Sequence, residues 1–125
     1  MKITPVLVVS AIEPVLPLWE SLGFTKKIEV PHGDALGFVA LEKDSLEVMY
    51  QTVESVRADE AATLEGRTAE GGSSLFIEVE NLDDVVANLP KDTNILVARR
   101  TTPYGSNETI VKDAGGNVIL FAQFG

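Results

Sequence analysis

The chain has 125 residues, of which 45% are hydrophobic and 23% charged, with a net charge of −9 and no cysteine. This length and apolar share are those of one domain with its own core, which excludes a disordered tail, a collagen-like chain and a disulfide scaffold. The negative charge disfavours nucleic acid and membrane surfaces as partners, because both are polyanionic. The lack of cysteine excludes thiolate metal sites and thiol nucleophiles and fits a reducing compartment, so we expect a cytoplasmic protein.

The residues near the start predict neither a signal peptide nor a membrane span. The apolar run there is interrupted by Ser10 and ended by Glu13 and Pro14, and no small-residue cleavage site follows it. No stretch of the chain approaches the roughly 20 apolar residues that a membrane-spanning helix needs.

Hydrophobic spacing and turn residues in the first half predict a strand, a helix and three strands. The first strand covers residues 5–9. The helix covers residues 12–22, with Ser10 as its N-cap, Glu13 at capping-box spacing and Gly23 just after its end. Further strands are predicted at residues 25–30, 36–41 and 46–51, separated by turns at 31–34 and 43–45.

The second half repeats this order after a polar connector. Residues 53–72 are rich in Glu and Ala and leave room for one short helix. A strand is then predicted from residue 74, and Asn81 is expected to cap a helix that runs through Leu89. Three more strands follow at residues 94–101, 108–112 and 118–124, and the last two are joined by a turn at 113–117.

A comparison of the two halves suggests an internal repeat. Placing residues 4–9 over residues 74–79, an offset of 70, also places Ile12 over Leu82, and the last strands match with Glu47 over Leu120. The identity is weak, so a duplicated unit and two unrelated halves both fit. In either case, eight strands and two helices indicate an α+β fold with helices on one face of each mixed sheet.

Two motifs carry a resemblance to a known family. In the first half, Val9-Ser10-Ala11-Ile12-Glu13 runs on to Leu18-Trp19-Glu20-Ser21-Leu22-Gly23-Phe24. In the second half, Tyr104-Gly105 precedes Glu108-Thr109-Ile110-Val111-Lys112-Asp113-Ala114-Gly115-Gly116-Asn117 and an apolar strand. Over nearly its whole length the chain resembles the vicinal-oxygen-chelate superfamily, which includes glyoxalases, bleomycin resistance proteins and extradiol dioxygenases.

The resemblance implies an α+β fold of two tandem βαβββ modules, which form a curved mixed sheet around a cavity. The helices then lie on the convex side, and function lies in the cavity. We expect a single domain over residues 1–125, with module 1 at about 1–52, a connector at about 53–72 and module 2 at about 73–125.

The metal ligands that the resemblance implies are mostly missing. Metal-using members of the superfamily hold four ligands, usually His, Gln or Glu, on the first and last strands of each module, and these positions fall here at Thr4, Glu47, Ser74 and Leu120. A divalent ion needs several carboxylate or imidazole donors, and only Glu47 is a good ligand. The sole histidine, His32, is expected in an exposed turn. We therefore predict no metal and no other cofactor.

Alternation along the strands defines the side chains that would face the cavity. They are Glu47, Met49 and Gln51 on the fourth strand, Ser74, Phe76 and Glu78 on the fifth, and Leu120, Ala122 and Phe124 on the eighth. From the resemblance we predict a ligand-binding site with no catalytic residue, formed by Glu47, Met49, Phe38, Ser74, Phe76, Tyr104, Arg100 and Phe124. Met and aromatic side chains at this spacing also fit an ordinary core.

The charged candidates each have two interpretations. Glu47 is either a lone acid that binds a cationic group or the partner of an internal Arg99 or Arg100. These two arginines are adjacent in a strand, so one side chain faces each way, and both also fit solvated ion pairs. Tyr104 and Gly105 shape a turn, where the aromatic ring could also stack on a planar ligand.

Three functions fit these features. The leading prediction is a metal-free protein of the bleomycin-resistance type that sequesters an antibiotic-like or other planar, cationic small molecule, because an acidic aromatic cleft attracts such ligands. A metal-dependent lyase, isomerase or dioxygenase of the same fold is the first alternative. A non-catalytic regulatory or interaction module with a filled cavity is the second. We expect a homodimer and no catalysis, since paired chains of this fold often complete each other's cavities.

Overall fold

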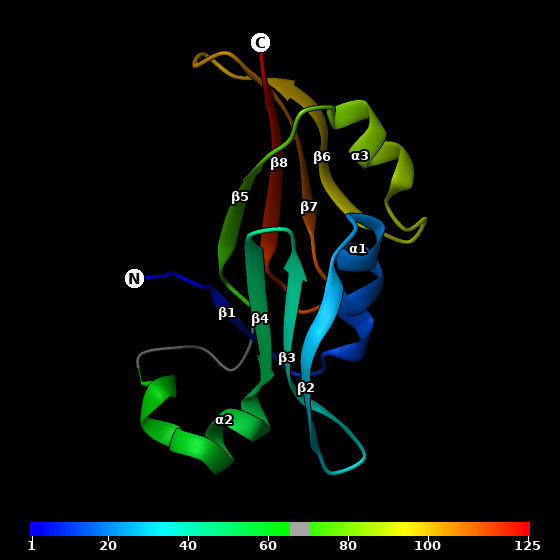
Figure 1. The fold of residues 1–125 in the computed structure, drawn as a ribbon. Helices are drawn as coiled ribbons and strands as arrows, with labels where there is room; N and C mark the ends of the chain where they lie inside the picture. Colours follow the sequence, from blue (N-terminus) through cyan, green and yellow to red (C-terminus); the bar gives the residue numbers. More distant parts are fainter. Residues whose placement is uncertain (66–70) are drawn as a thin grey trace.

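The computed structural model describes residues 1–65 and 71–125, which form two βαβββ modules (Figure 1). Module 1 contains β1 (Val6–Val9), the 3-10 turn η1 (Glu13–Val15), α1 (Leu16–Ser21), β2 (Thr25–His32), β3 (Ala35–Lys43) and β4 (Leu46–Thr52). The connector contains α2 (Val53–Glu60) and the 3-10 turn η2 (Ala61–Leu64). Module 2 contains β5 (Ser74–Glu78), α3 (Leu82–Asn88), β6 (Asn94–Thr101), β7 (Ser106–Lys112) and β8 (Val118–Phe124). Residues 66–70 of the expected connector lie outside the described residues.

Each module forms its own four-stranded mixed sheet. The strand orders are β1-β4-β3-β2 and β5-β8-β7-β6, and in each sheet the first and last strands of the module pair in parallel. The predicted α+β class and the duplicated strand order are confirmed. In the described part of the chain, the two sheets are not closed into a barrel.

The strand registers correct one detail of the expected repeat. Val6 pairs with Met49 in module 1, and Phe76 pairs with Leu120 in module 2. With the offset of 70 between β1 and β5, the position that matches Leu120 is therefore Met49. The expected match of Glu47 with Leu120 is wrong by two residues, which keeps both side chains on the same face because the strand period is two.

The first helix is shorter than predicted and its expected cap is absent. The region that was predicted as one helix is divided into η1 and α1, and Ser10 caps neither of them. Each of the two short elements begins beside a proline, Pro14 or Pro17, which has no N–H group and favours a helix start. Gly23 follows the helix with a φ of +92°, as expected for a residue after a helix end.

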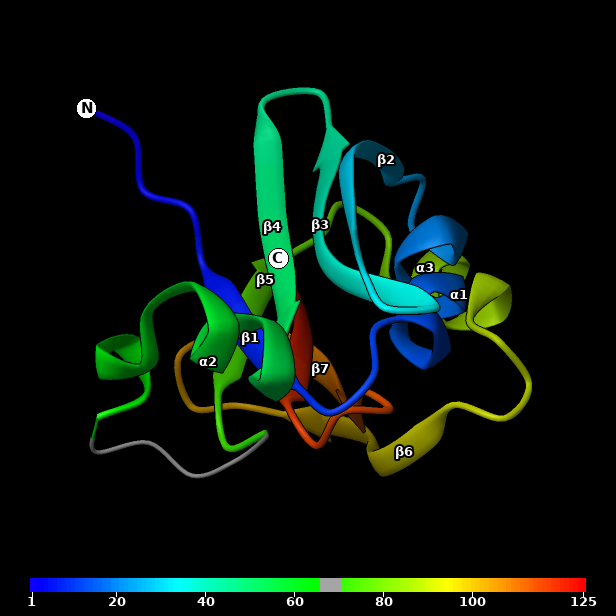
Figure 2. The ribbon, with the colours of Figure 1, turned by 90° about the horizontal axis from the view of Figure 1, so that it is seen from below.

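One hydrophobic core joins the two modules. It contains Leu7 and Val9 of β1, Trp19 of α1, Leu82 of α3 and Phe121 of β8, each at most 2% exposed. α1 and α3 lie on the same side of the molecule in both ribbon views (Figures 1 and 2). Each sheet therefore has a core face and an opposite, open face.

A buried hydrogen-bond chain also crosses between the modules. The indole N–H of Trp19 donates to the hydroxyl of Tyr50 at 2.9 Å, and that hydroxyl donates to Asp113 in the β7–β8 turn at 2.6 Å. Burial, followed by the negative charge of Asp113, raises the pKa of Tyr50 far above its ordinary value. The backbone N–H groups of Gly115 and Asn117 donate to the same aspartate, so this turn is fixed against β4.

α2 lies on the other side of module 1 from α1 (Figure 2). Its residues Val53 and Val56 form a small buried cluster with Val8 of β1, and Leu64 packs against it. The side-chain amide of Gln51 donates to Ser55 of α2. One end of the open face of module 1 is therefore covered. Among the described residues, no helix has the length and apolar character needed to cross a membrane.

Candidate functional site

The open face of sheet β5-β8-β7-β6 carries the candidate site, which we call the module 2 face. Leu75 and Ile77 of β5 pack against the core, so their alternating neighbours point the other way. The strand registers place one row of residues across the four strands of this face. In strand order, the row is Glu78, Ala122, Glu108 and Arg100.

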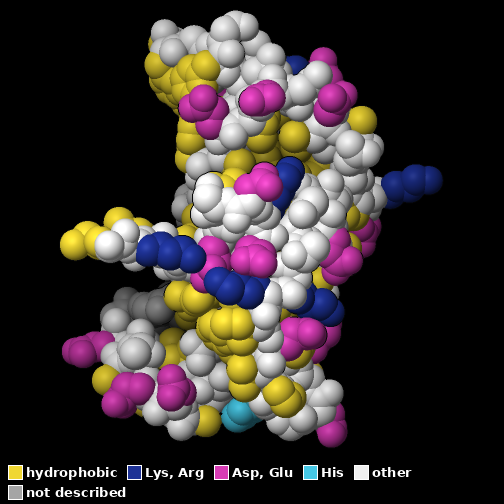
Figure 3. Space-filling model, viewed as in Figure 1, with side chains coloured by type: hydrophobic (Ala, Val, Ile, Leu, Met, Phe, Trp, Pro, Cys, Tyr) yellow, Lys and Arg dark blue, Asp and Glu magenta, His cyan; other side chains and the backbone are white. Residues whose placement is uncertain are grey.

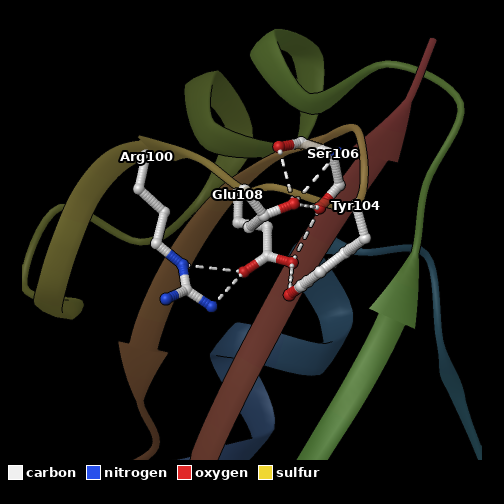
Figure 4. Close-up of polar contacts among 5 residues, drawn as sticks. Arg100, Tyr104, Ser106 and Glu108 are labelled. Carbon is white, nitrogen blue, oxygen red and sulfur yellow. Dashed lines mark hydrogen bonds and ion pairs between the residues drawn. The ribbon is translucent and has the colours of Figure 1, made fainter.

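Glu108 is the centre of a polar cluster on this face (Figure 4). Its Oε1 accepts hydrogen bonds from Nε of Arg100 at 2.9 Å and from Nη2 at 2.6 Å. Its Oε2 accepts from the hydroxyls of Tyr104 and Ser106, both at 2.9 Å. The carboxylate is 0% exposed, whereas the Arg100 side chain is 45% exposed. Four donors thus satisfy a fully buried carboxylate, as a buried charge requires.

The same contacts set the charge state of Glu108. Burial raises its pKa, but the hydrogen bonds from Arg100, Tyr104 and Ser106 lower it by more, and the pKa lies below the ordinary value of 4.5. Glu108 is therefore ionised at neutral pH and forms a neutral pair with Arg100. Because its lone pairs are all occupied, the carboxylate is not free to accept a proton from a ligand.

Exposed aromatic rings lie beside this cluster. Phe76, Tyr104 and Phe124 are 51%, 57% and 42% exposed, and the Phe124 ring centroid lies 6.3 Å from each of the other two. Figure 3 shows hydrophobic side chains at the upper end of the molecule, with acidic side chains next to them. Large exposed aromatic groups that cluster in this way are typical of a binding surface.

Glu78 supplies a carboxylate at the edge of the aromatic patch. It is exposed and lies two residues after Phe76 on the same face of β5. The ion pairs found within residues 1–65 and 71–125 do not include Glu78. The module 2 face therefore carries one solvated negative charge beside its aromatic rings and one internally neutralised ion pair.

Glu47, the acid singled out from the sequence, lies on module 1 and has different partners from those expected. Its Oε2 lies 2.8 Å from Nζ of Lys2 and 3.2 Å from Nζ of Lys27. Hydrogen bonds from Lys2 and then Lys27 lower its pKa. The suggested pairing with Arg99 or Arg100 is wrong, because these arginines lie in module 2 and bind Asp83 and Glu108.

The predicted site residues divide between the two modules. Phe76, Arg100, Tyr104 and Phe124 come together on the module 2 face. Ser74 is exposed at the other end of β5 from Glu78. The remaining predicted residues, Glu47, Met49 and Phe38, lie on the open face of module 1 and are half-buried.

Sequence reasoning missed Glu108 and Ser106 as site residues. The predicted strand began at residue 108, so Ser106 was placed in a loop, although β7 begins at Ser106. The alternation of Ser106, Glu108 and Ile110 could have indicated that these side chains lie on one face of the same strand. What the sequence lacked was the register that places Arg100 opposite Glu108.

The residues at the four expected metal positions do not fit a metal ion. Thr4, Ser74 and Leu120 offer weak ligands or none, and Glu47 is already bound by two lysines. Within the described residues, no group of three His, Cys, Asp or Glu side chains is close enough to hold one.

A separate depression of about 630 Å³ lies away from the module 2 face. Pro14, Pro17, Pro90, Lys112 and Gly115 are among its lining residues. It includes none of the predicted site residues.

Comparison with solved structures identifies the fold. The chain matches TioX from a Micromonospora species with a TM-score of 0.75 and 14% identity, over 98% of each chain. It matches a glyoxalase/bleomycin resistance protein/dioxygenase family enzyme from Burkholderia phytofirmans with a TM-score of 0.71 and 15% identity, over 96% of this chain and 95% of that one. A glyoxalase-related enzyme from Fulvimarina pelagi gives a TM-score of 0.69 and 15% identity, over 98% and 88%.

These structures confirm, at the level of the fold, the resemblance inferred from the sequence. The chain has the fold of glyoxalase/bleomycin resistance/dioxygenase proteins. No family model and no curated protein matches the sequence. Because the identities are this low, the likeness concerns the fold and leaves the chemistry to the residues of the site.

Proposed function

We propose that the protein binds and sequesters a small, planar organic ligand with a positive charge, without changing it chemically. The module 2 face is the binding surface. An antibiotic-like aromatic cation is the kind of molecule that meets these requirements. The observation that carries the proposal is the group of exposed rings of Phe76, Tyr104 and Phe124, which has a solvated carboxylate beside it.

Each part of the ligand has a counterpart on this face. A planar ring gains contact with the aromatic side chains, and a positive charge gains from the electron-rich ring faces. Glu78 adds a carboxylate that forms no ion pair within residues 1–65 and 71–125, and the net charge of −9 attracts cations over longer distances. Ala122, which lies between Glu78 and Glu108 in the row, is 0% exposed, so a ligand would contact the exposed rings of Phe76 and Phe124 rather than Ala122 itself.

The described residues favour binding over catalysis. The buried carboxylate of Glu108 already accepts four hydrogen bonds, and the one good ligand among the expected metal positions, Glu47, is bound by two lysines. A metal-dependent lyase, isomerase or dioxygenase therefore has less support than a binding protein.

A fluorescence titration with N-methylacridinium, a planar cation, tests the proposal. We expect saturable binding, and the variant Phe124→Ala should bind roughly five- to tenfold more weakly because it loses an aromatic contact. Leu46→Ala is the matched control, because Leu46 is also a large exposed apolar residue, 55% exposed against 42% for Phe124, and lies in module 1. Equal affinities of the wild type and Phe124→Ala would contradict the assignment to this face.

The homodimer expected from the sequence stays a prediction. Val6, Ile28 and Val30 are 39%, 43% and 47% exposed on the open face of module 1, and a second copy of the chain would remove such apolar area from water. Sedimentation velocity at micromolar concentration should give the mass of two chains. A single-chain mass would contradict the prediction.

A further inference from the structure

We infer that Arg100 is a second contact for the ligand and binds a carboxylate or carbonyl oxygen at the end of the ligand away from Glu78. This inference rests on the proposed function and adds one chemical requirement to it. The ligand would then carry a positive group at one end and a hydrogen-bond acceptor at the other.

The first argument is the number of donors that Arg100 has left. A guanidinium has five N–H groups, and the two hydrogen bonds to Oε1 of Glu108 use one on Nε and one on Nη2. Within residues 1–65 and 71–125, these are the side-chain hydrogen bonds found for Arg100. Three N–H groups remain, and the side chain is 45% exposed, so a ligand can reach them.

The second argument is the orientation of the guanidinium. Glu108 is fully buried and is itself fixed by Tyr104 and Ser106, so it holds Arg100 at one place on the face (Figure 4). The hydroxyl of Tyr104 lies on the same carboxylate, which brings the guanidinium close to an exposed aromatic ring. A planar donor that is already oriented loses less entropy when it binds an acceptor.

The third argument is the charge along the row. Glu78 and Arg100 lie at its two ends, with Ala122 and Glu108 between them. At about 4.8 Å between neighbouring strands, their backbones are about 14 Å apart. The carboxylate of Glu108 neutralises Arg100, so the guanidinium offers donors without strongly repelling a cation held nearby. The row is therefore acidic at one end and hydrogen-bond-donating at the other.

Three acridines that share one ring system test this inference. Neutral acridine presents the ring, N-methylacridinium adds the charge, and N-methylacridinium with a carboxylate on a four-carbon chain at the carbon opposite the nitrogen adds the acceptor at the far end of the row. We expect the carboxylate to increase affinity about fivefold over N-methylacridinium in the wild type, as an exposed ionic contact does. Arg100→Gln should abolish this gain, which is measured as the ratio of the two affinities in the same variant, so that any change in the affinity for N-methylacridinium itself cancels.

Two further variants make the result decisive. Arg100→Gln leaves Glu108 without its cation and could unfold, so the double variant Arg100→Gln/Glu108→Gln removes both charges together and should lose the gain as well. Arg99→Gln is the matched control, because Arg99 is the adjacent arginine and pairs with Asp83 of α3. It should keep the full gain.

The outcomes separate this inference from the proposed function. If the carboxylate adds no affinity, or if the gain survives in a folded Arg100→Gln variant, the role of Arg100 is overturned while ring binding stands. If none of the three acridines binds, the proposed function is overturned, and the role of Arg100 falls with it.

Discussion

The two modules carry equivalent rows of residues whose chemistry is opposite. In module 1, the row across β1, β4, β3 and β2 contains Val8, Gln51, Phe38 and Val30. In module 2, the equivalent row contains Glu78, Ala122, Glu108 and Arg100. The backbone pairing is the same, so the difference lies in the side chains and in what covers them.

The elements that pack on each row explain which residue types the row can contain. In module 1, α2 packs on Val8, which is 4% exposed beside Val53 and Val56. A charge placed there would be removed from water without a partner. In module 2, the end of the row at Glu78 is exposed, and the buried Glu108 carries its own set of donors. The same architecture thus gives a largely apolar row that α2 covers at one end in module 1, and a row with an exposed acid and a satisfied ion pair in module 2.

Exchanging the residue types at the first position of each row, Val8 and Glu78, should give the largest effect on the free energy of unfolding. Val8→Glu places a carboxylate under α2 and should lower the free energy of unfolding by more than about 3 kcal/mol, because the charge is buried without a partner. Glu78→Val, the reciprocal change on the exposed strand, should leave stability unchanged within the error of a urea titration. Similar losses in both variants would show that α2 does not cause the difference.

Removing the charge of Glu108 should have an intermediate effect. Glu108→Gln loses the ionic contact with Arg100 and presents an amide to the hydroxyls of Tyr104 and Ser106, so we expect a loss of about 1–3 kcal/mol in urea denaturation. No loss would mean that the cluster contributes nothing to the fold of module 2.

The pH dependence of the stability difference between the wild type and Glu108→Gln is a second test of the Glu108 cluster. The pKa of Glu108 is lower in the folded state than its ordinary value of 4.5. Its contribution to stability is therefore fully present above this value and is lost as the pH falls through the lowered pKa. The stability gap between wild type and Glu108→Gln should shrink in acid. Glu47, whose pKa is also lowered, is present in both proteins and cancels from the comparison. A stability gap that stays constant down to acidic pH would contradict the lowered pKa of Glu108 in the folded state.

Glu47→Gln should give the smallest effect. Glu47 belongs to module 1 and its partners, Lys2 and Lys27, are 59% and 43% exposed, so both lysines regain water when the carboxylate is lost. We expect little change in melting temperature and no change in the affinity for N-methylacridinium. A clear loss of affinity would move the binding surface to module 1.

Local patterns in the sequence predicted most of the elements. The eight strands occur where apolar alternation and turn residues placed them, and Asn81 caps α3 by accepting from the backbone N–H of Asp84, as expected. The first helix was predicted too long because Pro14 and Pro17 each begin a separate short element. Errors of this kind concern the ends of elements, where weak local preferences compete.

The sequence by itself determined the order of the elements and the side of each strand that faces the core, because these depend on residues close together in the chain. Only the tertiary structure decided which acid belongs to the candidate site. Glu47 is separated from Lys2 by 45 positions, and Glu108 meets Arg100 across a strand register with two irregularities. The tertiary structure also decided that α2 packs on Val8 and covers one end of the open face of module 1. Contacts of this kind depend on strand register and on the packing of separate elements, which residue spacing does not encode.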